Sequence, residues 1–215
     1  MMKAALTILS AVLAFAILEK DVNATIVLPT QSATITDENG DGTPETVGFG
    51  FGHPGDPNYG TTLVQKSPGY ERRSVEEFSL SGISAVQSAA LTFYFRNAVI
   101  ASSTFETFVT NGDGQVQLSD FSSISPSLGS RSVPGNQSYF ISYDVTSQLN
   151  SLLSGGATFV SVSQQVVGTQ GGDEVYSSQL TVTTVPEPAS AILCVLGGLS
   201  ILHASRQRKK TALHF

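Results

Sequence analysis

Alternation of apolar and polar residues marks several short segments of this chain as β-strands. In residues 89–96, Leu91, Phe93 and Phe95 alternate with more polar positions, as expected where one face of a strand packs against a core. A similar alternation, or an enrichment in Val, Thr, Phe and Tyr, predicts strands over residues 46–52, 73–80, 139–144, 158–167 and 179–184. Turn-forming Gly, Pro, Asn and Asp residues lie between these segments.

One short helix is predicted after the strand at 139–144. Thr146 is the expected N-cap, Leu149 and Leu152-Leu153 form an apolar face, and Gly155-Gly156 ends the helix. Many strands, frequent turns and little helix predict an all-β fold. We therefore expect an antiparallel β-sandwich of the jelly-roll type with one short helix over residues 25–184.

Residues 1–24 have the pattern of a secretory signal peptide. Lys3 gives a positive start, the run 4–18 is apolar, and Val22-Asn23-Ala24 offers small residues for cleavage. We expect a signal helix here and a mature start near Thr25. An N-terminal membrane anchor is the alternative, but the apolar run is shorter than the roughly 20 residues that a spanning helix needs.

The C-terminal segment, residues 185–215, has three parts in a fixed order. The motif Val185-Pro186-Glu187-Pro188 comes first, and an apolar stretch over 189–204 is the expected transmembrane helix. The basic tail over 205–215 contains Arg206, Arg208, Lys209 and Lys210. Basic residues after an apolar helix stop transfer and stay in the cytoplasm, so this segment predicts membrane attachment before processing.

This order of motif, helix and basic tail resembles the PEP-CTERM sorting signal of Gram-negative, biofilm-forming bacteria. The resemblance implies recognition by an exosortase, a membrane transpeptidase, with cleavage near the motif. It further implies an exported protein at the cell envelope, displayed at the outer surface or released into the extracellular matrix. An ordinary single-pass anchor is the alternative.

Charge is distributed unevenly along the 215 residues, whose net charge is −6. Residues 25–184 carry 14 acidic and 5 basic side chains, a net charge of −9, whereas residues 185–215 carry a net charge of +3. An acidic domain argues against a nucleic-acid partner, because binding a phosphate backbone requires Lys and Arg. The only cysteine, Cys194, lies in the C-terminal segment, which excludes a disulfide framework or a cysteine-built metal site in the domain.

Several short motifs of the predicted domain occur in one order: Asn58-Tyr59-Gly60, the Arg-led strand 73–80, Ser88-Ala89-Ala90-Leu91, Ser119-Asp120-Phe121 and Asp144-Val145-Thr146. This order resembles the DNRLRE-type jelly rolls, which are similar to carbohydrate-binding modules. The resemblance implies a jelly-roll fold and a carbohydrate ligand. It departs from the family at Ser79, where Asp is usual.

Asp37, Asn39, Asp41 and Glu45 form the sharpest local group of candidate ligands. The D-x-N-x-D-G spacing matches the first half of a calcium loop, in which oxygen ligands surround a bend that Gly permits. The twelfth loop position is Gly48, so the bidentate Glu of an EF-hand is missing. Two hypotheses stay open: a Ca²⁺ site, or a polar turn between strands.

Asn111, Asp113 and Asp120 form a second, weaker metal hypothesis. The first position of this partial loop is Val109, whose side chain cannot bind a metal. A β-turn is the alternative interpretation.

The sequence offers few groups for catalysis. His53 is the only histidine of residues 25–184, and no G-x-S-x-G motif accompanies it. Glu76 and Glu77 are neighbours on a predicted strand and should point to opposite faces, so they cannot form a paired-carboxylate site. We therefore expect a protein that is not an enzyme.

Two non-catalytic functions remain. The first is a structural or interaction protein of the cell surface or extracellular matrix. The second is a carbohydrate-binding module for exopolysaccharide, since exposed aromatic rings stack on the apolar faces of sugars. The chain has no Trp, and Tyr59, Tyr70 and Tyr176 are the candidate glycan contacts.

Overall fold

The computed structural model describes residues 24–49, 61–96, 102–135 and 137–184, which belong to one compact unit, Asn23–Thr184. The predicted signal helix, sorting motif, transmembrane helix and basic tail lie outside the described residues, except that Ala24 is the first residue of strand β1. No helix within the described ranges is both long enough and apolar enough to span a membrane.

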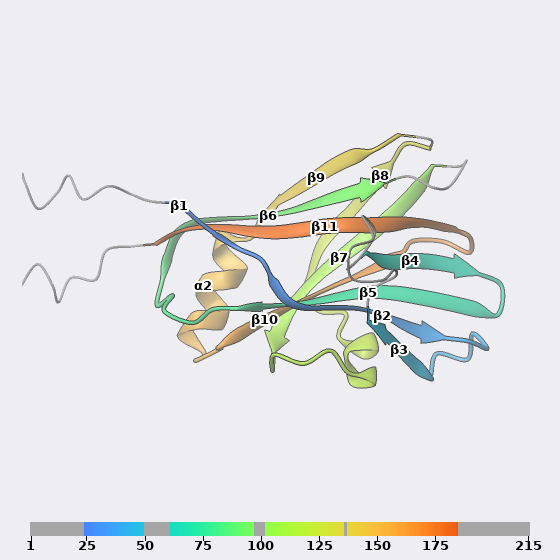
Figure 1. Ribbon diagram of the computed structural model, residues 1–215, viewed down its shortest axis with the longest axis horizontal. Helices are drawn as coiled ribbons and strands as arrows, with labels where there is room; N and C mark the ends of the chain where they lie inside the picture. Colours follow the sequence, from blue (N-terminus) through green and yellow to red (C-terminus); the bar gives the residue numbers. More distant parts are fainter. Residues whose placement is uncertain (1–23, 50–60, 97–101, 136, 185–215) are drawn as a thin grey trace, which may run out of the picture. The chain divides into compact units, whose positions relative to one another are not determined.

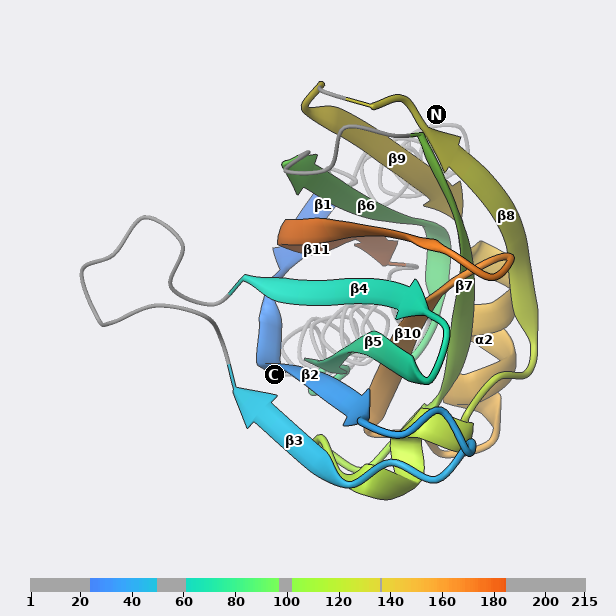
Figure 2. The ribbon, with the colours of Figure 1, turned by 90° about the vertical axis from the view of Figure 1, so that its right-hand side faces the viewer.

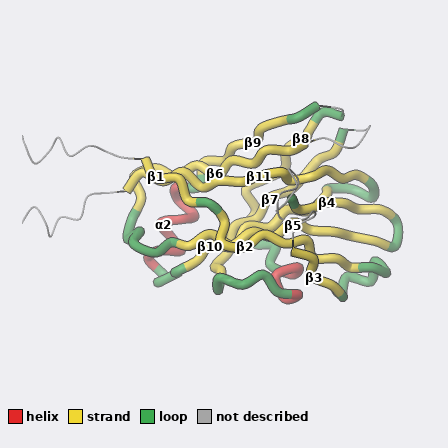
Figure 3. Tube along the Cα trace, in the orientation of Figure 1, coloured by secondary structure: helices red, strands yellow, loops and turns green. Residues whose placement is uncertain are grey.

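Strands dominate the described part of the chain (Figures 1 and 3). They are β1 (Ala24–Val27), β2 (Pro29–Asp37), β3 (Thr46–Phe49), β4 (Thr62–Ser67), β5 (Tyr70–Ser79), β6 (Val86–Arg96), β7 (Ser103–Gly112), β8 (Ser127–Val133), β9 (Tyr139–Asp144), β10 (Phe159–Val166) and β11 (Gly171–Thr184). A 3-10 helix, η1 (Leu118–Ser122), precedes β8, and one α-helix, α2 (Thr146–Ser154), follows β9.

The strands pair in the order β8-β7-β10-β5-β4-β11-β6-β9, and every pair is antiparallel. Strand β2 pairs with β5 and β3, and β1 pairs with β11. The sheet bends so that β6 and β11 lie across the core from β7 and β10 (Figure 2). This is the antiparallel, jelly-roll-like β-sandwich that the sequence predicts.

The main core lies between these two layers. Phe93 and Phe95 of β6 are at most 1% exposed, and the ring of Phe95 stacks on that of Phe105 of β7 at a centroid distance of 5.1 Å. Leu149 of α2 joins the same cluster. The predicted inward face of residues 89–96 is therefore confirmed, and its burial provides much of the hydrophobic stabilisation of the fold.

A smaller core lies on the other face of β5. Val75 of β5 packs there with Ile35 of β2, and the segment 113–122, which we call the η1 segment, contributes Val116 and Phe121 to the same cluster. Both faces of β5 are thus covered, which explains why five consecutive residues, 74–78, are buried.

The start of α2 differs from the prediction. Val145 occupies the N-cap position, and Thr146 is the first helical residue. The backbone N–H of Thr146 donates to Asp144 Oδ1 at 3.0 Å, while the Thr146 hydroxyl accepts from the backbone N–H of Ala89 at 2.9 Å. Thr146 therefore ties the start of the helix to β6. Its hydroxyl also donates to Asp144 Oδ1 at 2.6 Å, and this hydrogen bond, together with the one from the Thr146 backbone N–H, lowers the pKa of Asp144.

Candidate functional site

Three aromatic side chains gather on the outer side of the layer formed by β11, β6 and β9. The rings of Tyr94 and Phe140 stack at a centroid distance of 4.7 Å, and Tyr176 meets Tyr94 edge-on at 5.6 Å. Phe140 is 68% exposed, the largest value among the exposed large hydrophobic side chains of the described residues. We call these three residues the aromatic face.

Strand geometry explains this arrangement. Tyr94 alternates with the buried Phe93 and Phe95 and must therefore point outward. Phe140 lies directly opposite Tyr94 in the β6–β9 register. A register shift between Val175 and Ser177 interrupts the β11–β6 pairing at Tyr176, whose ring packs against Tyr94.

A row of uncharged polar side chains lies next to the aromatic face. Thr92 of β6 stands between Gln179 of β11 and Ser142 of β9 in register. The hydroxyls of Thr92 and Ser142 are 3.1 Å apart. This row places amide and hydroxyl groups beside the rings, and both kinds of group can donate and accept hydrogen bonds.

Of the three predicted tyrosines, the two that the structure describes lie in different places. Tyr176 belongs to the aromatic face, whereas Tyr70 begins β5 and lies under the guanidinium of Arg72, 4.8 Å from its ring centroid. Tyr59 lies outside the described residues. Sequence reasoning missed Tyr94 and Phe140. The alternation in 89–96 already implied an outward Tyr94, but the pairing of β6 with β9 was needed to find its partner.

The predicted calcium loop does bring three carboxylates together. Oxygen atoms of Asp37, Asp41 and Glu45 all lie within 4.8 Å of one another. Asp37 is 2% exposed and accepts the backbone N–H groups of Gly40 at 2.6 Å and Gly42 at 2.8 Å. Asp37 Oδ1 also accepts the Asn39 N–H at 3.3 Å, so the lone pair left for a cation is on Oδ2, which accepts the Gly42 N–H. The donor set, all oxygen, fits Ca²⁺.

The Asn39 side chain forms two hydrogen bonds within the same loop. Its amide N–H donates to Glu45 Oε1 at 2.9 Å, and its oxygen accepts the backbone N–H of Asp41, also at 2.9 Å. Glu45 Oε2 accepts the backbone N–H of Glu38 at 2.6 Å. Asn39 therefore braces the loop and holds Glu45 near the other carboxylates.

The second predicted loop does not gather a comparable group within the described residues. Asn111 pairs with Val160 inside the β7–β10 ladder. Asp113 accepts the backbone N–H of Gln115 at 2.9 Å, and Asp120 accepts that of Gln117 at 2.8 Å. Burial raises the pKa of Asp120, and the nearby Asp113 raises it further.

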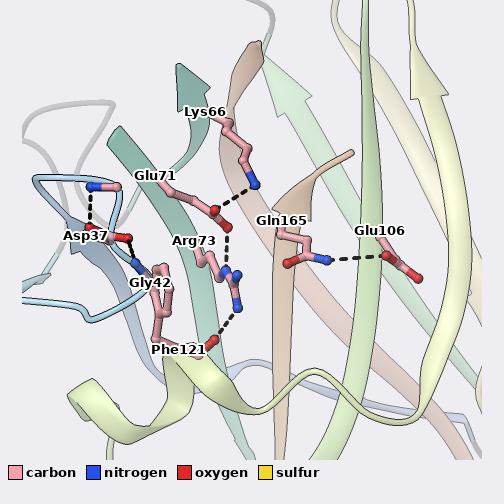
Figure 4. A network of polar contacts seen from close by, with 9 residues as sticks. Asp37, Gly42, Lys66, Glu71, Arg73, Glu106, Phe121 and Gln165 are labelled. Carbon is pink, nitrogen blue, oxygen red and sulfur yellow. Dashed lines mark hydrogen bonds and ion pairs between the residues drawn. The ribbon is translucent and has the colours of Figure 1, made fainter. Parts of the chain in front are cut away.

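A polar network ties the calcium-loop side of the domain together (Figure 4). Glu71 of β5 forms ion pairs with Lys66 of β4 at 2.8 Å and with Arg73 at 2.7 Å. Arg73 also donates to the carbonyl oxygen of Phe121, which joins η1 to β5. These charged side chains pair with one another and with the backbone, so we assign them to the scaffold rather than to ligand binding.

Candidate catalytic carboxylates are separated as predicted. Glu77 Oε2 accepts the backbone N–H of Gly114 at 3.1 Å, on the η1 side of β5. Glu76 points into the main core, where burial raises its pKa to about 7 and the facing Ser178 hydroxyl opposes that rise. Among the described residues, Ser178 Oγ has no hydrogen-bond partner. His53 lies outside the described residues.

No protein-family model matches the chain, and no curated protein matches it. Solved structures similar to it are carbohydrate-binding modules, among others. The xylan-binding module CBM15 is 11% identical with a TM-score of 0.44, covering 75% of this chain and 97% of that one. CBM35 from Cellvibrio japonicus Abf62 is 12% identical with a TM-score of 0.37, covering 76% and 99%. A family 35 module from Clostridium thermocellum is 12% identical with a TM-score of 0.34, covering 74% and 97%.

Proposed function

We propose that the chain is an exported, non-catalytic glycan-binding protein whose aromatic face stacks on sugar rings of an exopolysaccharide. The observation that carries this proposal is the position of Phe140. Its ring is 68% exposed and is braced from behind by Tyr94, with Tyr176 edge-on to Tyr94. An exposed ring whose orientation is fixed by neighbours loses little conformational entropy when a ligand stacks on it.

The chemistry of this face fits a carbohydrate. The C–H groups of a pyranose ring form an apolar face that an aromatic ring can desolvate. Sugar hydroxyls at the ring edge need donors and acceptors, which Thr92, Ser142 and Gln179 supply in the next row. None of these six side chains is charged, which favours a neutral glycan.

Export and sorting complete the proposal. The signal peptide over 1–24 would direct secretion, and the segment 185–215 would hold the precursor in the membrane until an exosortase-type transpeptidase acts near Pro186-Glu187-Pro188. The product would then place its glycan-binding domain at the outer surface or in the biofilm matrix.

We also propose that Asp37, Asp41 and Glu45 bind calcium, and that this calcium has a structural role. The loop that carries them joins β2 to β3, and a bound cation would neutralise three converging negative charges. Its proposed role is to stabilise this end of the sandwich.

Affinity electrophoresis of the full chain in mild detergent tests the glycan proposal. Gels containing hydroxyethyl cellulose, xylan or glucomannan should retard the protein, and Phe140→Ala should be retarded clearly less than the parent chain in the gel that retards it. Tyr139→Ala is the matched control, because Tyr139 is 41% exposed and pairs with the inward-facing Phe95. Equal retardation of both variants and the parent chain would contradict the proposal.

A further inference from the structure

A groove of about 470 Å³ lies on β2, β3 and β5, away from the three strands that carry the aromatic face. Its walls include Thr34, Thr36, Glu38, Thr46, Tyr70 and Arg72. Neither the aromatic face nor the calcium loop accounts for this groove. Its volume falls within the range of small-molecule sites, roughly 300–1,000 Å³.

The groove is built by register. Arg72 of β5 lies directly opposite Thr36 of β2, and Thr36 lies directly opposite Thr46 of β3. One row across three strands therefore presents a guanidinium and two threonine side chains. In the next row Thr34 pairs with Gly48, which has no side chain and leaves the floor of the groove open.

The polar groups of the groove come with a fixed geometry. The Arg72 guanidinium lies over the Tyr70 ring at 4.8 Å, and Arg72 Nη1 donates to Gln65 Oε1 at 3.4 Å. Glu38 projects from the loop after β2, and the Thr46 hydroxyl donates to its carboxylate at 3.4 Å. A strong donor, Arg72, and a strong acceptor, Glu38, thus line the same groove, and the Tyr70 ring at the start of β5 lies beside the donor.

We infer that this groove is a second glycan site, which takes a neutral pyranose residue with neighbouring hydroxyls. Such a diol offers hydrogens to the Glu38 carboxylate and lone pairs to the Arg72 guanidinium, while the sugar ring can contact Tyr70. An anionic sugar is disfavoured, because the Glu38 carboxylate lines the groove and would repel it.

Two sites on different parts of the sandwich make the domain bivalent. This inference rests on the proposed function, because it assumes that both sites bind neutral glycans. A bivalent domain binds a polysaccharide with higher avidity than either site and can link two separate chains. That property suits a matrix protein that organises polysaccharide.

A groove-blocking variant tests the second site. Gly48→Leu places a side chain in the groove, and a Cβ at position 48 meets only the Thr34 carbonyl oxygen, at 3.9 Å. The strand should therefore tolerate the substitution. Isothermal titration calorimetry of the full chain in detergent, with cellotetraose, xylotetraose and mannotetraose in turn, counts the sites. Thermal melting of each variant confirms that it is folded.

The expected stoichiometry is two sugars for the parent chain, one for Gly48→Leu, one for Phe140→Ala and none for the double variant. If Gly48→Leu keeps the parent stoichiometry while Phe140→Ala loses a site, the groove inference is wrong and the aromatic face stands. If only Gly48→Leu loses a site, the groove stands and the aromatic face is wrong. Absence of binding by all three sugars overturns both.

Discussion

Glu76 and Glu77 are adjacent on β5, yet their carboxyl groups are buried in two different parts of the molecule. Glu76 is 3% exposed and faces Ser178 in the main core, whereas Glu77 is 1% exposed and accepts the Gly114 N–H beneath the η1 segment. Glu76 Oε2 has no hydrogen-bond partner within the described residues. The burial of both acids makes the stability of the fold depend on pH.

Burial raises the pKa of Glu76 from 4.5 to about 7 and also raises that of Glu77. The folded state therefore holds protons that the unfolded state releases between about pH 4.5 and pH 7. Stability should be greatest below this window and fall as the pH rises through it, by about 3 kcal/mol for Glu76 alone. Urea unfolding of the full chain at pH 5 and pH 8 measures this difference.

Glu76→Gln should remove most of that pH dependence, because the amide cannot ionise, and should leave the smaller part that Glu77 contributes. The variant should be more stable than the parent chain at pH 8. An unchanged difference between the two pH values would show that Glu76 is not the responsible group.

Arg73 should be a main support of the smaller core. Its guanidinium carbon lies 3.9 Å from the ring centroid of Phe121, and it pairs with Glu71, whose side chain is 10% exposed. Arg73→Met keeps the aliphatic stem and leaves Glu71 and the Phe121 carbonyl without this partner, at a cost of about 2 kcal/mol in unfolding free energy. Arg131→Met, at an exposed position on β8 where the guanidinium lies 5.6 Å from the Tyr143 ring centroid, should cost less, at most about 1 kcal/mol. Equal urea midpoints for the two variants would refute this role.

Calcium should raise the melting temperature of the chain. At about 1 mM Ca²⁺ the gain expected from a site of extracellular type is about 1 kcal/mol, and a chelator should abolish it. In the parent chain the Thr43 N–H donates to Asp41 Oδ1 at 2.8 Å. Asp41→Asn keeps an oxygen that can accept this hydrogen bond but should lose the calcium response. Glu38→Gln changes a residue of the same loop that is not one of the three grouped carboxylates, and this variant should keep the calcium response. If the melting temperature is the same with calcium and with chelator, the calcium hypothesis is wrong and the loop is only a polar turn.

The sorting proposal has its own test. Replacing Pro186, Glu187 and Pro188 with Ala should block processing, so that an uncleaved precursor accumulates in the membranes of a host that contains an exosortase. Immunoblots of membrane and medium fractions measure this. Normal processing of the variant would favour an ordinary anchor over a sorting signal.

Local patterns were sufficient for the fold class and for several elements. Leu91, Phe93 and Phe95 alternate clearly enough to fix which face of β6 is buried, and α2 was predicted from its leucines. The pattern misplaced the cap: Thr146 has a side chain typical of an N-cap, but its hydroxyl contacts Ala89 of β6 and Asp144, and Val145 occupies the cap position.

The candidate sites depended more on pairing between distant strands. The carboxylates of the calcium loop are close in sequence, so their spacing could predict that they would meet. Phe140 and Tyr94 are 46 positions apart in numbering and meet only because β6 pairs with β9. The groove likewise needs β2 between β3 and β5, an order that no local pattern encodes.

The proposed glycan binding requires that the exposed ring at position 140 stacks on a sugar. Phe140→Leu separates stacking from general apolar contact, because leucine keeps an apolar side chain and removes the flat ring face. The dissociation constant for the polysaccharide that retards the parent chain should rise about tenfold or more in this variant, as for Phe140→Ala, and should be restored by Phe140→Trp. If Phe140→Leu binds as tightly as the parent chain, stacking at this face is contradicted.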